Sequence, residues 1–222
     1  MFATTPLRVV AVSAGLSQPS STRLLADRLA AATRERLTAE QDRDGRDVEV
    51  RVIELRDLAV DIANHLVSGF PPAGLREAID AVTEADGLIA VTPVFTASYS
   101  GLFKSFFDLI DHTALTGKPV VIAATGGTAR HSLVLEHALR PLFAYLRAVT
   151  VPTSVYAASE DWGSSGDEYT EGLPSRIRRA GGELASAVLG RTVSGASRAL
   201  GLDDGEDAVV PFEQQLADLR LD

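Results

Sequence analysis

Residues 13–22 form a stretch that is rich in hydroxyl side chains and lies between an apolar run and a helical pattern. The stretch reads SAGLSQPSST, and its final hydroxyl residues offer N-cap chemistry to the helix that follows. Hydroxyl groups, backbone N–H groups and the positive end of a helix would then point at one place, which favours phosphate binding. An ordinary turn that ends in a serine N-cap fits the same residues equally well.

Two common phosphate-binding motifs are missing from the chain. Neither G-x-x-x-x-G-K-[ST] nor G-x-G-x-x-G occurs, so nucleotide hydrolysis and a dinucleotide turn are disfavoured. Residues 13–22 also contain no lysine. A loop of neutral donors suits the terminal phosphate of a phosphomonoester such as FMN.

Two further stretches have the composition of ligand-binding loops. Residues 92–101 read TPVFTASYSG, in which proline and small residues keep the backbone open while Phe95 and Tyr99 provide apolar walls for a flat ligand. Residues 124–128 read ATGGT, and paired glycines let backbone approach a ring because no Cβ intervenes. Each loop follows an apolar run, so we expect the loops to converge on one site.

Five apolar runs predict the strands that position these loops. The runs alternate with helical patterns through short connections, which predicts a parallel sheet of right-handed βαβ units in a doubly wound three-layer α/β sandwich. In such a sheet, ligands bind beyond the carboxyl ends of the strands. The predicted strands are 7–13, 47–55, 88–92, 118–124 and 149–156.

Helical periodicity predicts the remaining elements. A first helix should begin near Ser20 or Ser21, and a glycine pair at 181–182 should cut the last one. Residues 56–74 show no such pattern and predict irregular structure. The other predicted helices contain Leu75, Ile79 and Val82, then Leu102, Phe106 and Ile110, then residues 132–148, and finally 175–197.

Together the three loops resemble those of the NADPH-dependent FMN reductases of the flavodoxin-like superfamily. The resemblance covers residues 7–156 and rests on the serine-rich loop, on T-P-x-[YF]-x-x-x-Y-S-G at 92–101, and on A-T-G-G-[ST] at 124–128. It implies a flavodoxin-like, doubly wound, five-stranded parallel sheet of order 2-1-3-4-5 with helices on both faces. This chain departs from the family pattern at two places. The family often has arginine near the position of Leu16, and it often has Tyr-Asn where this chain has Phe95 and Thr96.

The same resemblance implies FMN as the cofactor, with NADPH or NADH as co-substrate, and it indicates the residues that bind FMN. His131 would face the flavin or the nicotinamide, with a solvent-exposed helix start as the alternative. The candidate residues are Ser13, Ser20, Ser21 and Thr22 at the phosphate, Pro93, Val94, Phe95 and Thr96 at the isoalloxazine edge, Thr125, Gly126 and Gly127 on its other side, and Leu16, Ser98 and His131 as further contacts.

The resemblance implies an NAD(P)H-dependent FMN reductase that supplies reduced flavin. The match continues through the helix at 133–148 and there resembles the branch that serves flavin-dependent monooxygenases, which implies a monooxygenase as partner. Hydride transfer between nicotinamide and flavin is the chemistry of the cofactors, so no catalytic side chain is predicted. Two alternatives share these loops: an FMN-dependent quinone or azo reductase, and a non-enzymatic flavodoxin-like electron carrier, which the acidic composition favours slightly.

Composition excludes several other classes of function. A formal net charge of −9 argues against a nucleic-acid partner, and the absence of cysteine excludes disulfides and a cysteine nucleophile. His65, His112 and His137 lack ligand-like spacing, so no metal is predicted. No apolar run approaches the ~20 residues of a membrane span, and we expect a cytoplasmic protein with no membrane partner.

The sequence also predicts domain organisation and assembly. We expect one FMN-binding domain over residues 1–200 and an acidic tail over 201–222, where Phe212, Leu216 and Leu219 have the spacing of a short docking helix. The family resemblance places a π-type irregularity near His137. The helix at 132–148 carries more apolar residues than one buried stripe needs, which predicts a homodimer or homotetramer. These residues are Leu133, Leu135, Leu139, Leu142, Phe143 and Leu146.

Overall fold

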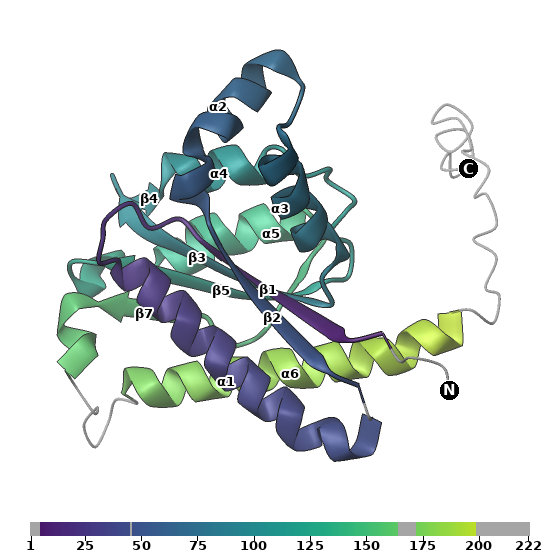
Figure 1. Ribbon diagram of the computed structural model, residues 1–222. Coiled ribbons are helices and arrows are strands. Elements are labelled where there is room, and N and C mark those ends of the chain that lie inside the picture. Colours follow the sequence, from purple (N-terminus) through teal and green to yellow (C-terminus); the bar gives the residue numbers. More distant parts are fainter. Residues whose placement is uncertain (1–4, 45, 164–171, 199–222) are drawn as a thin grey trace, which may run out of the picture. The chain divides into compact units, whose positions relative to one another are not determined.

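A parallel sheet forms the centre of the computed structural model, which describes residues 5–44, 46–163 and 172–198 (Figure 1). The described residues up to Leu189 form one compact unit. The strand order is β2-β1-β3-β5-β6, and β7 also pairs with β5. This confirms the predicted 2-1-3-4-5 order, because β6 and β7 together replace the predicted fifth strand. The strands are β1 (Leu7–Ser13), β2 (Val48–Glu54), β3 (Gly87–Phe95), β5 (Pro119–Gly126), β6 (Val149–Thr150) and β7 (Val155–Ala158).

The inner strands β1, β3 and β5 are covered on both faces. Successive side chains of β1 alternate between the two hydrophobic clusters of the protein: Val10 and Val12 pack in one, Val9 and Ala11 in the other. Complete burial of a valine or leucine side chain contributes about 1.5–3 kcal/mol. The near-continuous apolar runs of these strands therefore reflect burial on both sides.

Helices form a layer on each face of the sheet (Figure 1). Leu25 and Leu29 of α1 pack with Leu184 of α6 on one face. Phe103 and Phe143 lie on the other face, with ring centroids 6.4 Å apart and nearly perpendicular planes. The helices of these layers are α1 (Ser21–Asp44) and α6 (Leu173–Arg198), and α3 (Ala73–Glu84), α4 (Gly101–Phe107) and α5 (Arg140–Tyr145) opposite them.

The predicted fifth strand is interrupted between β6 and β7, so its prediction as one element was wrong. Pro152 has no N–H group with which to continue the ladder. The next residue, Thr153, donates its backbone N–H and its hydroxyl to the two carboxylate oxygens of Glu183, each at 2.7 Å. These bonds to α6 take the place of ladder bonds to β5.

Residues 56–74 are more regular than the sequence predicts. They contain most of the short 3-10 helix η1 (Leu55–Leu58) and all of α2 (Ala59–Ser68). Only Ile62 of α2 is buried, whereas Val60 and Val67 are 72% and 91% exposed. Apolar residues do recur at helical spacing in α2, for example at Ile62 and Leu66, and this periodicity was missed in the sequence.

The glycine pair at 181–182 does not cut α6, contrary to the prediction. A Cβ atom at Gly181 would lie 2.9 Å from the Cβ atom of Ala32 and 3.0 Å from the backbone nitrogen of Thr33. Gly181 therefore permits close contact between α6 and α1 rather than a helix break.

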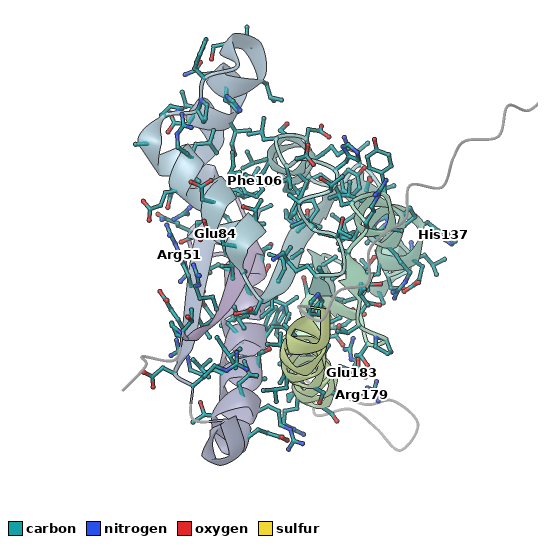
Figure 2. The ribbon with its side chains drawn as sticks, turned by 90° about the vertical axis from the view of Figure 1, so that its right-hand side faces the viewer. Arg51, Glu84, Phe106, His137, Arg179 and Glu183 are labelled. Carbon is teal, nitrogen blue, oxygen red and sulfur yellow. The ribbon has the colours of Figure 1, made fainter. Side chains whose placement is uncertain are left out.

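The predicted helix at 132–148 consists of a π-helical turn, η3 (Leu135–Leu139), followed by α5. The π-turn contains the exposed His137, where the family resemblance placed it (Figure 2). Leu135, Leu139, Phe143 and Leu146 are all buried within the chain. Most of the apolar surplus that predicted an oligomer thus belongs to the core, and the oligomer stays a prediction.

Two predictions concern residues that the structure does not fully cover. The acidic tail over 201–222 lies outside the described residues, and so do the last two residues of the predicted domain, 199–200. Among the residues that are described, no helix combines the length and the apolarity needed to cross a membrane.

Candidate functional site

The three predicted loops leave the same edge of the sheet. Ser13 of β1 pairs with Val91 of β3, and Pro93 of β3 pairs with Thr125 of β5, all in parallel strands. The first and third loops meet directly, because the hydroxyl oxygens of Thr22 and Thr125 lie 2.8 Å apart. The expected convergence is therefore a feature of the fold, at the edge where doubly wound proteins bind ligands.

Ser13 ends β1 with a buried hydroxyl group. Its Oγ atom has no hydrogen-bond partner within the described part of the chain. The next backbone amide, of Ala14, donates to the Val91 carbonyl at 3.0 Å, so the loop departs only after this bond. A buried hydroxyl without a partner costs about 1–3 kcal/mol. The Ser13 hydroxyl is thus available to a ligand such as a phosphate.

Ser20 caps α1, as the sequence predicts. Its Oγ atom accepts from the backbone N–H of Arg23 at 3.2 Å, and its carbonyl accepts from Leu24 at 3.0 Å. A Cβ atom at Gly15 would lie 2.0 Å from Ser20 Oγ, so only glycine permits this close turn. The positive end of a long helix and several hydroxyl groups therefore surround one point.

The second loop is a tight hairpin between β3 and the two-residue strand β4 (Ser98–Tyr99). Thr96 and Ala97 form its tip with positive φ angles of 49° and 65°. Residues other than glycine and asparagine rarely adopt such backbone angles. Below the tip, Thr92 Oγ1 accepts from the Ser100 N–H at 3.0 Å. Ser100 in turn caps α4. The hydrogen bonds of Thr92 and Ser100 below the tip thus hold it in an unfavourable backbone conformation.

The third loop lies against Tyr156 of β7. The Tyr156 hydroxyl donates to the Thr128 carbonyl at 2.8 Å, and a Cβ atom at Gly126 would lie 2.0 Å from the same hydroxyl. Burial raises the pKa of Tyr156, and the carboxylates of Asp161 and Glu160 raise it further. The phenol therefore stays protonated and keeps its bond to the glycine loop.

The candidate residues lie on the three loops at this edge and differ in burial, and six of the fourteen are exposed. Leu16 and Phe95 are 53% and 47% exposed. His131 is exposed in the 3-10 helix η2 (Ala129–His131) and has no bond that would place it at a ring. The buried candidates are Ser13, Thr22, Pro93 and Thr125; those half-buried are Ser20, Val94, Ser98 and Gly126; and those exposed are Leu16, Ser21, Phe95, Thr96, Gly127 and His131.

Sequence reasoning missed three residues that shape the loops. Tyr156 holds the third loop, Ser100 holds the base of the second, and Arg56 donates to the Ser17 carbonyl of the first at 3.2 Å. Only Ser100 had a local signal, as a hydroxyl residue directly before a helix. The other two act on residues 28 and 39 positions away.

The residues at this edge fit FMN. They offer a partnerless buried hydroxyl and a helix start to the phosphate, and a glycine bend and an apolar hairpin to a flat ring. A cavity of about 480 Å³ between α1 and β2 contains none of the candidate residues, so it is a separate feature. Within the described ranges, no three His, Asp or Glu side chains are grouped so that they could hold a metal ion.

Comparison with known proteins gives close relatives. The chain is 42% identical over 192 residues to an FMN reductase (NADPH) from Pseudomonas aeruginosa, across 85% of this chain and 96% of that protein. It is also 42% identical over 185 residues to the NADH-dependent FMN reductase SfnF of Pseudomonas fluorescens, across 83% and 93%.

A solved structure of an oxidoreductase from Corynebacterium diphtheriae matches with a TM-score of 0.77 and 46% identity, over 84% of this chain and 99% of that one. The profile of the NADPH-dependent FMN reductase family matches residues 7–163, which include all three loops. This chain belongs to the NADPH-dependent FMN reductase family and has the flavodoxin-like fold.

Proposed function

We propose that the protein transfers hydride from NADPH or NADH to FMN, and that FMN binds at the carboxyl edge of the sheet. The observation that carries the site assignment is the buried Ser13 hydroxyl, which has no partner among the described residues and stands at the end of β1, where the loop to α1 begins. Buried polar groups are almost always hydrogen-bonded in a working protein. A phosphate oxygen is the partner that suits the surrounding donors.

The first loop has donors to spare for a phosphate. Ser20 Oγ accepts from the backbone of Arg23 and therefore keeps its own O–H group for a ligand. In the pair formed by Thr22 and Thr125, the hydroxyl that accepts likewise keeps its proton. The exposed Ser21, at the first position of α1, adds a further hydroxyl. These neutral groups would bind the charged phosphate through hydrogen bonds of about 1.5–3 kcal/mol each.

The second and third loops would hold the ring. Pro93, Val94 and Phe95 present backbone and apolar surface at the end of β3, and the glycine bend at 126–127 permits close approach from β5. When bound, FMN supplies the hydride-accepting ring, and the nicotinamide supplies the hydride. The side chains therefore orient the two rings, and we assign no acid or base. His131 is proposed as a cofactor contact only.

We further propose that reduced FMN leaves this site for a flavin-dependent monooxygenase in the cytoplasm. The exposed Leu16 and Phe95 support exchange of the flavin, because the candidate site opens outward at both loops.

We also propose one FMN-binding domain over residues 1–200 and a homodimer or homotetramer. Leu133 and Tyr145, at 63% and 72% exposure, support an interface on this side of the chain. Light scattering on the purified protein tests the oligomer, and a mass of one chain would refute it.

Anaerobic stopped-flow mixing of the FMN-loaded protein with NADPH or NADH tests the reaction. We expect bleaching of the visible flavin band, and steady turnover when free FMN is the substrate. No bleaching with either nucleotide would support an electron carrier instead. Bleaching without release of flavin, together with turnover of a quinone or azo dye, would support the other alternative.

The site assignment is tested by a double variant, Ser20→Ala with Thr22→Ala. Loss of bonds to a charged group should weaken FMN binding by about 1.5–3 kcal/mol for each hydroxyl. The matched control is Thr116→Ala, because the Thr116 hydroxyl is exposed and bonds only to the Thr113 carbonyl before β5. Calorimetry with FMN compares the three proteins, and an unchanged affinity in the double variant would refute the phosphate assignment.

A further inference from the structure

Arg56 reaches the first loop from the neighbouring edge strand. It lies in η1, directly after β2, and its side chain is only 16% exposed. Its Nη1 atom donates to the backbone carbonyl of Ser17 at 3.2 Å. In its hydrogen-bonded orientation, the side-chain amide of Gln18 accepts from the same guanidinium group. Arg56 thus contacts two consecutive residues in the middle of the loop.

Two carboxylates lie close to the Arg56 guanidinium, although its buried Nε atom makes no hydrogen bond to either of them. Its Nε atom lies 3.4 Å from carboxylate oxygens of both Glu54 and Asp57. The other oxygen of Glu54 accepts from Arg23 at 2.7 Å, and the backbone of Arg23 binds the N-cap of α1. A continuous set of charged contacts therefore joins the middle of the loop to its end. Networks of this kind fix a loop more firmly than an isolated surface ion pair.

The bond to the Ser17 carbonyl also sets the direction of an amide. The C=O group of Ser17 and the N–H group of Gln18 belong to one planar peptide unit, and they point in opposite directions in a trans peptide. The only cis peptide in the described residues is the next one, between Gln18 and Pro19. Because Arg56 binds the carbonyl, the Gln18 N–H is turned away from Arg56.

We propose that Arg56 is a positioning residue for phosphate binding, which sets the first loop so that the Gln18 N–H faces the FMN phosphate. The proposal rests on the proposed FMN site. It goes beyond that site because Arg56 belongs to η1, which carries none of the cofactor-binding residues assigned above. The neutral loop gains an ordered amide donor without placing a cation at the phosphate.

The test compares FMN with riboflavin, which lacks the phosphate, in binding titrations on Arg56→Met. Methionine keeps a long, unbranched side chain at position 56 but has no hydrogen-bond donor. Its dissociation constant for FMN should rise on the order of tenfold, as expected for loss of one hydrogen bond to a charged group. Its affinity for riboflavin should stay at the wild-type value. Arg56→Lys keeps one donor for the Ser17 carbonyl and should restore part of the preference for FMN.

Arg51→Met is the matched control. Arg51 lies on β2, the strand that leads into η1, close to Glu84 (Figure 2), and pairs with the exposed Glu77 at 2.8 Å, away from the loop. It should bind both flavins as the wild type does. The inference is overturned if Arg56→Met and Arg56→Lys both keep the wild-type ratio of the two dissociation constants, or lose both flavins equally. If the wild type itself shows no preference for FMN over riboflavin, the proposed phosphate site fails instead.

Discussion

Gly126 has no room for a side chain, and its replacement by alanine should destabilise the fold by about 1.5–3.5 kcal/mol. The new Cβ atom would lie 2.0 Å from the Tyr156 hydroxyl and 3.1 Å from Cζ of the same ring. Tyr156 is only 4% exposed, so the ring cannot swing into solvent. Overpacking costs about 1–3 kcal/mol, and loss of the bond to Thr128 adds about 1 kcal/mol. Reduced entropy of the unfolded chain offsets roughly 0.5 kcal/mol.

A double-mutant cycle with Tyr156→Phe isolates the cause. Removal of the hydroxyl should cost about 1 kcal/mol alone, through the lost bond to the Thr128 carbonyl. In that background the nearest ring atom lies 3.1 Å from the new methyl group, which is a tight contact rather than an overlap. Alanine at position 126 should then cost less than about 1 kcal/mol, which gives a coupling free energy of at least about 0.5–2.5 kcal/mol.

Urea denaturation of the four proteins without flavin measures this coupling. Trp162 is the only tryptophan and reports unfolding by fluorescence, with far-ultraviolet circular dichroism as a second probe. If the costs of Gly126→Ala and Tyr156→Phe simply add, the hydroxyl is not what excludes a side chain at Gly126, and the proposed contact between β7 and the glycine loop is wrong.

Three other changes have measurable consequences. Lys118→Met should lower the free energy of unfolding by about 1–3 kcal/mol, because the buried Lys118 ammonium binds carbonyl groups at the end of α3; equal urea midpoints would contradict this. Thr96→Asn should raise that free energy by about 0.5–1 kcal/mol, since asparagine tolerates the positive φ at the hairpin tip, and a lower melting temperature would speak against the strain. The raised pKa of Tyr156 means that its neutral phenol contributes stability in full below pH 10.0, the ordinary pKa, and loses it as pH rises through the folded-state pKa. Tyr156→Phe should therefore flatten the alkaline fall of stability, and an unchanged profile would refute the assignment.

Local patterns were sufficient to predict most of the sheet and the three loops. Burial on both faces leaves an unmistakable apolar run, as in β1, β3 and β5. The start of α1 at Ser21 followed from its hydroxyl residues, and the convergence of the loops followed from the parallel order of strands. In each case a few neighbouring residues carry the physical cause.

The remaining features depend on contacts between distant parts of the chain. The helix α2 is an exception, because its apolar residues, such as Ile62 and Leu66, do recur at helical spacing, so a helix at 59–68 could have been predicted and was missed. The glycine pair in α6 looks like a helix break unless the close approach of Ala32 is known. The roles of Arg56 and Tyr156 arise only when η1 and β7 are placed beside the loops. Tertiary packing decides these positions, and no local pattern records it.

Among the described strands, β2 at one edge of the sheet and β6 and β7 at the other each pair with a neighbour on one side only. An uncovered strand edge is a template for aggregation. On β2, Glu49 is exposed, and Arg34 lies 3.5 Å from the backbone oxygen of Val50, so charged side chains crowd that edge. At the opposite edge, the interruption at Pro152 leaves strands of two and four residues, too short to recruit a neighbour. Short strands at one edge and charged side chains at the other make both edges poor templates for a strand from a second copy, and the interruption at Pro152 contributes to this.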